Sequence, residues 1–219
     1  GIKISEKKIK KRFQGKLGSD LSYLSKTAYG NFTKTRVLNN NKKLKVLIAP
    51  HSFSDAPHQL GKHLFADYYE WLKFIILNAS DKYDWYIKCH PNFVDYFDNT
   101  LAIVKKMIKQ NKIIKYLNPN ISHRQLIKEG IKVVITCHGT IGSEYPYFNL
   151  MVVNASNSNP HINYKFNLHP KSKYQLKHIL NNLHKQKVKT FKKEVLEYYF
   201  MKNIYFSNNW LFENFDNLI

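Results

Sequence analysis

The feature that most constrains this sequence is a regular alternation of short apolar runs with segments of helical periodicity. Each apolar run has only five or six residues, a length typical of buried strands. Apolar strands separated by helices form a parallel sheet that is covered on both faces. We therefore predict an α/β fold with a doubly wound, mainly parallel, Rossmann-like sheet. The predicted strands are residues 45–49, 84–89, 112–117, 131–136 and 150–154, and the predicted helices are residues 64–78, 93–110, 122–129, 141–148 and 171–183.

Two segments flank this domain, which we place at residues 44–188. Residues 1–43 are a basic, helical or irregular lead-in, and residues 189–219 are aromatic-rich helices expected to pack back on the domain. Because the first residue is Gly1 rather than Met, we expect the lead-in to be the end of a missing N-terminal region.

The charge of the chain limits its partners. Lys and Arg total 35 against 15 Asp and Glu, a net charge of +20, while 43% hydrophobic residues exclude a disordered polycation. Only three of the cations are arginine, the usual reader of bases and phosphates, so no specific nucleic acid is expected. The lysine excess fits codon bias in an AT-rich genome. It also fits attraction to an anionic inner membrane surface or to an anionic substrate.

The cysteine content indicates a compartment. Cys89 and Cys137 both end apolar runs and are expected to be buried thiols, since two cysteines form no disulfide framework. We therefore expect a cytoplasmic protein, peripheral at the inner face of the cell membrane.

Polar clusters follow four of the predicted strands, where ligands bind in doubly wound sheets. Seven of the ten histidines lie in or beside these loops: His51, His58, His90, His123, His138, His161 and His169. The position of these residues, more than their type, predicts a binding site at that edge of the sheet.

The loop after the fourth strand is the candidate phosphate cradle. His138, Gly139, Thr140, Gly142 and Ser143 combine small residues, hydroxyls and a helix start, which together favour an anion. The segment has no P-loop lysine. The alternative is a glycine-containing turn with a hydroxyl cap.

His90 and Pro91 end the second strand. An imidazole there titrates near neutrality and can neutralise charge on a departing phosphate, with Pro91 fixing the turn. The alternative is a strand-end histidine bonded to local backbone. Lys88 is a further donor-binding candidate, although strand alternation points it to the face away from His90.

The first loop contains His51, Asp55 and His58, a set suited to activating an acceptor hydroxyl. Their spacing also admits a metal site, but without a recognised ligand pattern we expect no metal and no required cofactor. In the later loops, Glu144 and Asn159 are candidates for holding ribose or sugar, and His161 is a further candidate for donor binding. As an alternative, Glu144 is a first-turn acid favoured by the helix dipole.

Three motifs together resemble a known group of enzymes. "KVLIAPHSFSD", "WYIKCHPN" and "VVITCHGTIGSEYPYFNLMVVNA" are similar to the C-terminal, donor-binding half of GT-B-type transferases of bacterial surface polysaccharides. These include capsule and lipopolysaccharide glycosyltransferases, teichoic-acid glycerophosphotransferases and His-Pro-motif sialyltransferases. The resemblance implies that His90 and Pro91 contact the donor's nucleotide phosphate, and that Thr140 and Ser143 cradle phosphate.

The sequence departs from that group in two ways. A GT-B enzyme has two Rossmann-like domains, and this chain has room for one. In addition, His138-Gly139-Thr140 stands where teichoic-acid enzymes carry a Ser-Ser pair, which leaves the donor open.

We therefore expect a glycosyltransferase-like enzyme, or part of one. It would transfer a glycosyl or activated alcohol-phosphate group from a CMP-, CDP- or UDP-linked donor to a polysaccharide or lipid-linked acceptor. The catalytic candidates are His51, Asp55 and His90. The alternatives are a non-catalytic basic module that binds nucleic acid or anionic membrane and, more remotely, a metal-dependent hydrolase that uses the loop histidines.

Overall fold

The computed structural model of the chain describes residues 1–16, 26–30, 32–55, 64–94, 99–109, 111–188 and 192–205. Its centre is a five-stranded sheet in which every pairing is parallel. The strands are β1 (Lys45–Ala49), β2 (Asp84–Ile87), β3 (Ile114–Tyr116), β4 (Ile131–Thr136) and β5 (Met151–Asn154). Their order across the sheet is β3-β2-β1-β4-β5, so the winding reverses between β1 and β4.

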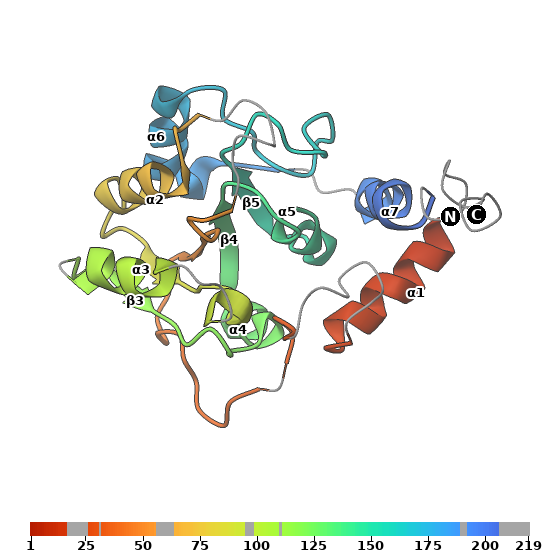
Figure 1. Cartoon of the computed structure of the whole chain (residues 1–219), viewed down its shortest axis with the longest axis horizontal. Helices are drawn as coiled ribbons and strands as arrows, with labels where there is room; N and C mark the ends of the chain where they lie inside the picture. Colours follow the sequence, from red (N-terminus) through yellow and green to blue (C-terminus); the bar gives the residue numbers. More distant parts are fainter. Residues whose placement is uncertain are drawn as a thin grey trace, which may run out of the picture.

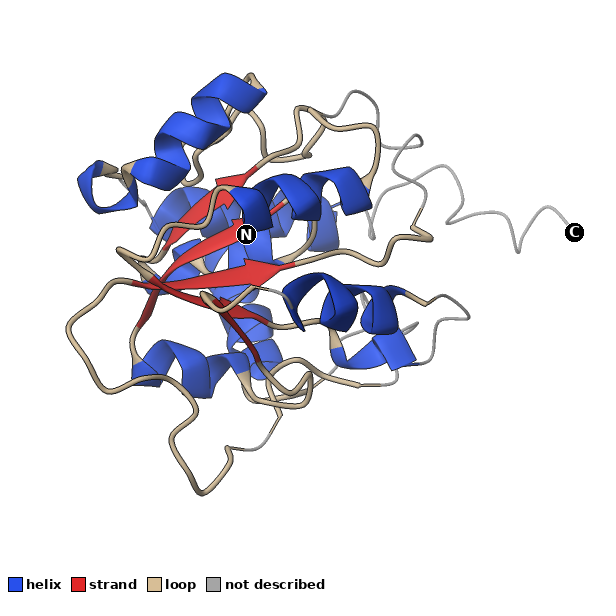
Figure 2. Cartoon of the chain, turned by 90° about the vertical axis from the view of Figure 1, so that its left-hand side faces the viewer, coloured by secondary structure: helices blue, strands red, loops and turns tan. Residues whose placement is uncertain are grey.

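Helices cover both faces of the sheet, as Figure 2 shows. One face packs against α2 (Tyr68–Leu77), α3 (Thr100–Lys109) and α6 (Lys173–Asn181). The other face packs against α4 (His123–Glu129) and α5 (Ile141–Glu144). Adjacent residues of one strand serve opposite faces: Val46 and Ile48 contact the first group, and Leu47 contacts the second. The predicted doubly wound α/β fold is confirmed.

Local sequence explains where several helices begin and end. Asp67 caps α2 by accepting a hydrogen bond from the Glu70 amide at 2.7 Å, so the helix starts later than residue 64. Gly130 ends α4 in the left-handed conformation, as predicted. Ser122 precedes α4 but makes no side-chain capping bond.

The helix predicted over residues 93–110 is observed as α-helix from Thr100 to Lys109, and residues 95–98 and 110 lie outside the described residues. A short 3-10 helix, η3 (Pro91–Val94), follows β2, and α3 begins only at Thr100. Short 3-10 segments also follow α5 and α6, namely η4 (Pro146–Phe148) and η5 (Leu183–Lys185). Pro146, the first residue of η4, prevents α5 from continuing as predicted, because proline lacks the amide hydrogen that an α-helix needs.

The flanking segments pack on each other and on the sheet domain. Helix α1 (Ile2–Phe13) lies beside α7 (Lys192–Phe200), which continues as the π-helix η6 (Met201–Tyr205) (Figure 1). The buried Phe13 ring meets the rings of Tyr29, Tyr147 and Phe148 at centroid distances of 4.5–5.2 Å. Through these aromatic contacts the start of the chain is fixed against η4.

Candidate functional site

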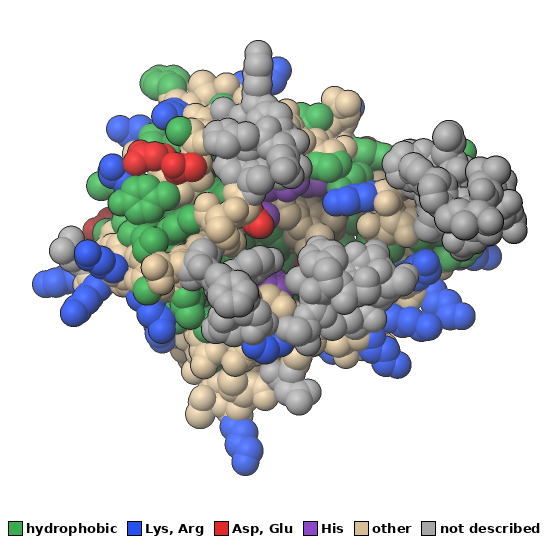
Figure 3. Space-filling view, in the orientation of Figure 1, with side chains coloured by type: hydrophobic (Ala, Val, Ile, Leu, Met, Phe, Trp, Pro, Cys, Tyr) green, Lys and Arg blue, Asp and Glu red, His purple; other side chains and the backbone are tan. Residues whose placement is uncertain are grey.

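A cavity of about 280 Å³ opens at the carboxyl edge of the sheet, where the winding reverses. It lies between the ends of β1, β2 and β4, the place at which doubly wound folds bind ligands. Figure 3 shows histidine and acidic side chains in a recess at the centre of this face. Its walls include residues of all three corners singled out in the sequence: His51 and Asp55, Lys88 and His90, and His138, Gly139, Thr140 and Glu144.

The His90 corner and the Gly139 corner, about fifty residues apart in sequence, therefore face one cavity. His90 accepts a hydrogen bond at Nδ1 from the Asn92 amide at 3.2 Å, which leaves the ring proton on Nε2. Burial lowers the pKa of His90 to about 4, helped by the positive charge of Lys88. His90 is thus a neutral hydrogen-bond donor at pH 7, rather than a group that titrates near neutrality.

Lys88 is the buried cation of the cavity. Alternation continues beyond β2: the Lys88 amide still donates to the Ile48 carbonyl at 3.1 Å, and Cys89 packs on the opposite side with Ile87. The Lys88 side chain lines the same cavity as His90, two residues on, contrary to the expectation that it faces away from His90. Its exposed fraction is 2%, and burial lowers its pKa to about 7. A bound anion would supply the missing counter-charge and favour the protonated amine.

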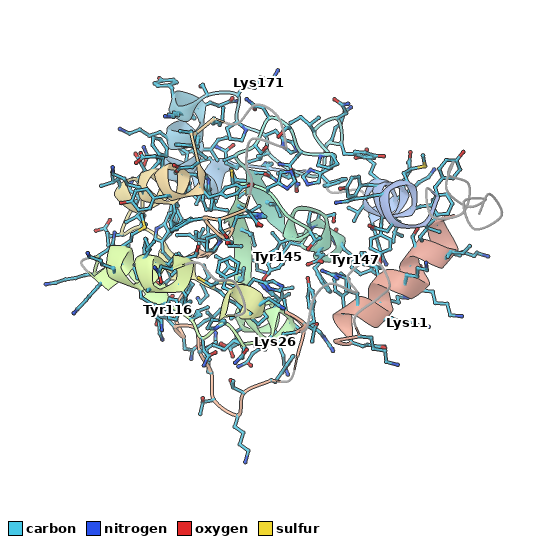
Figure 4. The ribbon with its side chains drawn as sticks, in the orientation of Figure 1. Lys11, Lys26, Tyr116, Tyr145, Tyr147 and Lys171 are labelled. Carbon is cyan, nitrogen blue, oxygen red and sulfur yellow. The ribbon has the colours of Figure 1, made fainter. Side chains whose placement is uncertain are left out.

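Lys88 belongs to a short buried chain of polar groups. Its Nζ lies 3.3 Å from His123 Nε2, and His123 Nδ1 lies 2.7 Å from the Tyr145 hydroxyl. Tyr145 is labelled near the centre of Figure 4. Burial lowers the pKa of His123 well below its usual range, so this ring is neutral and its two nitrogens take opposite roles. If His123 Nε2 accepts from Lys88, Nδ1 carries the proton toward Tyr145.

His51 is held by both ring nitrogens. Nδ1 lies 3.2 Å from the Asp55 carboxylate, and Nε2 contacts the His138 carbonyl oxygen. The ring also stacks on Tyr68 at a centroid distance of 4.9 Å. His51 therefore joins the first loop to the fourth, and its role as a base for an acceptor hydroxyl stays a prediction.

Gly139 is required where these loops meet. Its φ of +116° is in the region that favours glycine, and a Cβ there would lie 2.9 Å from His51 Nε2. We expect Gly139→Ala to cost about 2 kcal/mol of unfolding free energy, through backbone strain and displacement of His51. Urea denaturation measures the loss, with Gly30→Ala as the control because a Cβ at Gly30 meets nothing within 4 Å. Equal stability of the two variants would contradict this account of the loop.

The lead-in segment, residues 1–43, contributes two residues that hold the cavity residue Glu144 and that the sequence did not indicate. Arg12, in the last turn of α1, forms a buried ion pair with Glu144 and donates to Thr140 Oγ1 at 3.3 Å. The Tyr29 hydroxyl donates to the other Glu144 oxygen at 2.7 Å. Spacing gave no signal for either residue, and only the scarcity of arginine set Arg12 apart.

Other predicted residues lie beside the cavity rather than on its wall. Ser143 donates to the Thr140 carbonyl at 3.0 Å. Asn159 bonds to Asn154 at 2.5 Å, and His161 is buried against Phe166 and Tyr198. A Cβ on Gly142 would lie 2.6 Å from His161 Nε2, so Gly142 permits close packing of α5 on this loop. Pro91 begins η3 next to His90.

His58 lies outside the described residues. Among the residues that the structure describes, no group of three His, Cys, Asp or Glu side chains is placed to hold a metal ion. Cys89 and Cys137 are buried free thiols, and burial raises the pKa of each to about 12.

Comparison with known proteins gives similarity of structure but not of sequence. No family model and no curated protein matches the chain. KpsC from Thermosulfurimonas dismutans, a beta Kdo 2,4 transferase, superposes with a TM-score of 0.56 at 13% identity, over 90% of this chain and 54% of KpsC. The chain thus spans about half the length of that structure. This likeness concerns the fold, and it confirms the expected Rossmann-like half of a GT-B-type fold.

Two more distant structures are also similar. The UDP-GlcNAc 2-epimerase from Neisseria meningitidis, bound to UDP-GlcNAc, has a TM-score of 0.47 at 10% identity, over 75% of this chain and 45% of its own. The wall teichoic acid polymerase TagF has a TM-score of 0.42 at 15% identity, over 74% of this chain and 39% of its own.

Proposed function

We propose that this chain binds the phosphate of a nucleotide-activated donor and takes part in glycosyl transfer to a bacterial surface polysaccharide. The observation that carries the proposal is the meeting of the His90 and Gly139 corners in one cavity at the winding reversal. Lys88 and Arg12 add positive charge, and His90 and Thr140 add hydrogen-bond donors. The fold supports the same function, because KpsC is a Kdo transferase.

The cavity residues have different proposed roles in binding the donor. Lys88 and Arg12 attract the phosphate charge, and neutral His90 donates a hydrogen bond to a phosphate oxygen. As the bond between the sugar and the phosphate oxygen breaks, negative charge grows on that oxygen, and the same three groups stabilise it. The attacking acceptor hydroxyl loses its proton to a base, for which we propose the Asp55 carboxylate oriented by His51, because both ring nitrogens of His51 contact acceptor oxygens.

The dimensions of the cavity favour a small ligand. Its volume of about 280 Å³ is at the lower end of pockets that hold small molecules, so it takes a phosphate with a ribose or a sugar. We propose only an indirect role toward the ribose or sugar hydroxyls for Glu144, Asn159 and His161. The Glu144 carboxylate is already bonded to Arg12 and Tyr29, and Asn159 and His161 are buried and do not line the cavity. A related activated alcohol-phosphate donor fits the same chemistry.

We propose that the reaction takes place in the cytoplasm. Two buried free thiols are compatible with a reducing compartment. No helix in the described part of the chain is long and apolar enough to cross a membrane.

Calorimetry with CMP, CDP and UDP tests the proposal. We expect at least one of the three to bind, and His90→Ala to weaken that binding about tenfold by removing one hydrogen bond to a charged group. The matched control is His178→Ala on the exposed face of α6, which should leave the affinity unchanged. Failure of all three nucleotides to bind would reject the proposal. Salt-dependent binding of nucleic acid without any nucleotide effect would support a basic binding module instead.

A further inference from the structure

Helix α1 has two faces of different chemistry. Its inner face buries Ile9 and Phe13 and carries Arg12 into the cavity. Its outer face exposes four lysines, namely Lys3, Lys7, Lys8 and Lys11. Lys11 is labelled at the outer edge of the molecule in Figure 4. We call these four side chains the α1 lysine face.

The α1 lysine face keeps its positive charge. Glu6 is the acidic residue of this helix, and it is engaged by Lys10 at 3.2 Å and by Lys192 at 2.9 Å. Within the described ranges, the four lysines of the face form no ion pair. The four cations lie within nine residues and have no counter-charge on this face, so the face attracts anionic partners.

Apolar side chains lie at the beginning of the same helix. Ile2 and Ile4 are 38% and 51% exposed, and Met201 in η6 is 38% exposed. Ile4 lies on the same side of the helix as the four lysines, whereas Ile2 is in line with the buried Ile9. Gly1 lies against Phe200, so the start of α1 meets the end of α7, the residue before Met201. Exposed apolar residues next to lysines are typical of helices that lie in a membrane interface.

We propose that the α1 lysine face and the adjoining apolar end dock the protein on an anionic lipid bilayer. Lysines near such a surface each contribute about 1 kcal/mol, and Ile4 enters the boundary between headgroups and acyl chains. Nucleic acid is the less suitable partner, because its phosphate backbone offers no apolar contact to Ile4. The proposal goes beyond nucleotide binding and does not depend on it.

Vesicle sedimentation tests the docking. The intact chain is mixed with phosphatidylcholine vesicles that contain about one third phosphatidylglycerol, or none. We expect binding only to the anionic vesicles, weakened by salt. Reversal of three charges in Lys3→Glu, Lys7→Glu, Lys11→Glu should lower the affinity about 100-fold, from roughly 1 kcal/mol for each lysine.

The matched control reverses three exposed lysines at the opposite end of the molecule, at Lys106, Lys109 and Lys112 in and after α3 (Figure 1). Its net charge equals that of the α1 variant, so we expect a loss of less than about threefold if docking is local. Equal losses for the two variants would overturn the proposal, because they would indicate attraction by overall charge.

Two further measurements complete the test. Ile4→Ser should weaken the binding that persists at high salt, because that part depends on apolar burial. The variant with glutamine at the three α1 positions should also lose binding, which guards against misfolding of the glutamate variant. No binding to anionic vesicles, or displacement of the vesicles by equimolar single-stranded RNA, would overturn the proposal. Nucleotide calorimetry on the same variants should be unchanged.

Discussion

Lys88→Met is expected to abolish nucleotide binding while making the protein more stable. In the folded state the amine is buried and its pKa is lowered to about 7. Burial of this amine therefore lowers the free energy of unfolding at neutral pH, because the charged form loses its hydration. Methionine fills similar space without that cost. We expect a gain of about 2 kcal/mol in unfolding free energy, after allowing for the partner that His123 loses. Removal of the charge should weaken nucleotide binding at least about 100-fold.

The matched control for this variant is Lys45→Met. Lys45 is also buried, but it lies at the beginning of β1, and its Nζ donates to the Asn41 carbonyl at 2.9 Å. We expect it to lose stability and keep nucleotide affinity. Thermal denaturation and calorimetry on both variants measure the two effects. A Lys88→Met protein that is less stable than wild type, or that binds nucleotide normally, would remove Lys88 from the proposed site.

The pH dependence follows from the same lysine. Below pH 7 the Lys88 amine is charged in the free protein, so nucleotide affinity should be constant there as far as this group is concerned. Above pH 7 binding must take up a proton, and affinity should fall up to about tenfold per pH unit. The free energy of unfolding should rise with pH between pH 7 and the ordinary pKa of a lysine, because over that range the unfolded chain binds one more proton than the folded chain. Calorimetry in two buffers of different ionisation enthalpy detects the uptake, which Lys88→Met should eliminate.

Arg12→Ala is expected to have the other large effect, a loss of about 3 kcal/mol of unfolding free energy. The Arg12 and Glu144 side chains are only 12% and 6% exposed, so loss of the arginine leaves a buried carboxylate that still accepts a hydrogen bond from Tyr29. Nucleotide affinity should also fall about tenfold, because a cation of the cavity wall is lost.

A double-mutant cycle separates these effects. The cycle compares Arg12→Met, Glu144→Gln and the double variant with both changes. The double variant removes both charges, so its loss of unfolding free energy should be smaller than the sum of the two single losses. The control is Lys10→Ala, which breaks the exposed pair with Glu6, where Lys10 is 60% exposed, and should cost less than about 0.5 kcal/mol. Urea denaturation gives all four values. If Arg12→Ala were as mild as Lys10→Ala, the ion pair would not hold α1 against the site.

The sequence determined the order and type of the elements because apolar periodicity is a local property. Strands β1 and β4 have the predicted bounds, since each is a continuous apolar run with a clear stop. Pattern alone did not show that residues 93 and 94 belong to the 3-10 helix η3 rather than to the predicted α-helix. That difference depends on how the chain leaves β2 beside the site.

The place of the site was also predictable. Parallel strands carry their carboxyl ends to one edge of a sheet, so the loops containing His51, His90 and Gly139 had to meet there. The participation of Arg12 and Tyr29 was not predictable, because it depends on α1 packing against η4 and α7 through Phe13 and its neighbouring rings. Long-range packing of this kind leaves no periodicity in the residues that it brings together.

Residue type and spacing in the sequence therefore determined the sheet, its winding and the edge where chemistry belongs. Only the tertiary structure decided the protonation and the partners of the groups at that edge. The amine of Lys88, the neutral ring of His90 and the engaged carboxylate of Glu144 all result from burial and from neighbours distant in sequence. Burial changes the free energy of a charge, and burial exists only after the chain has folded.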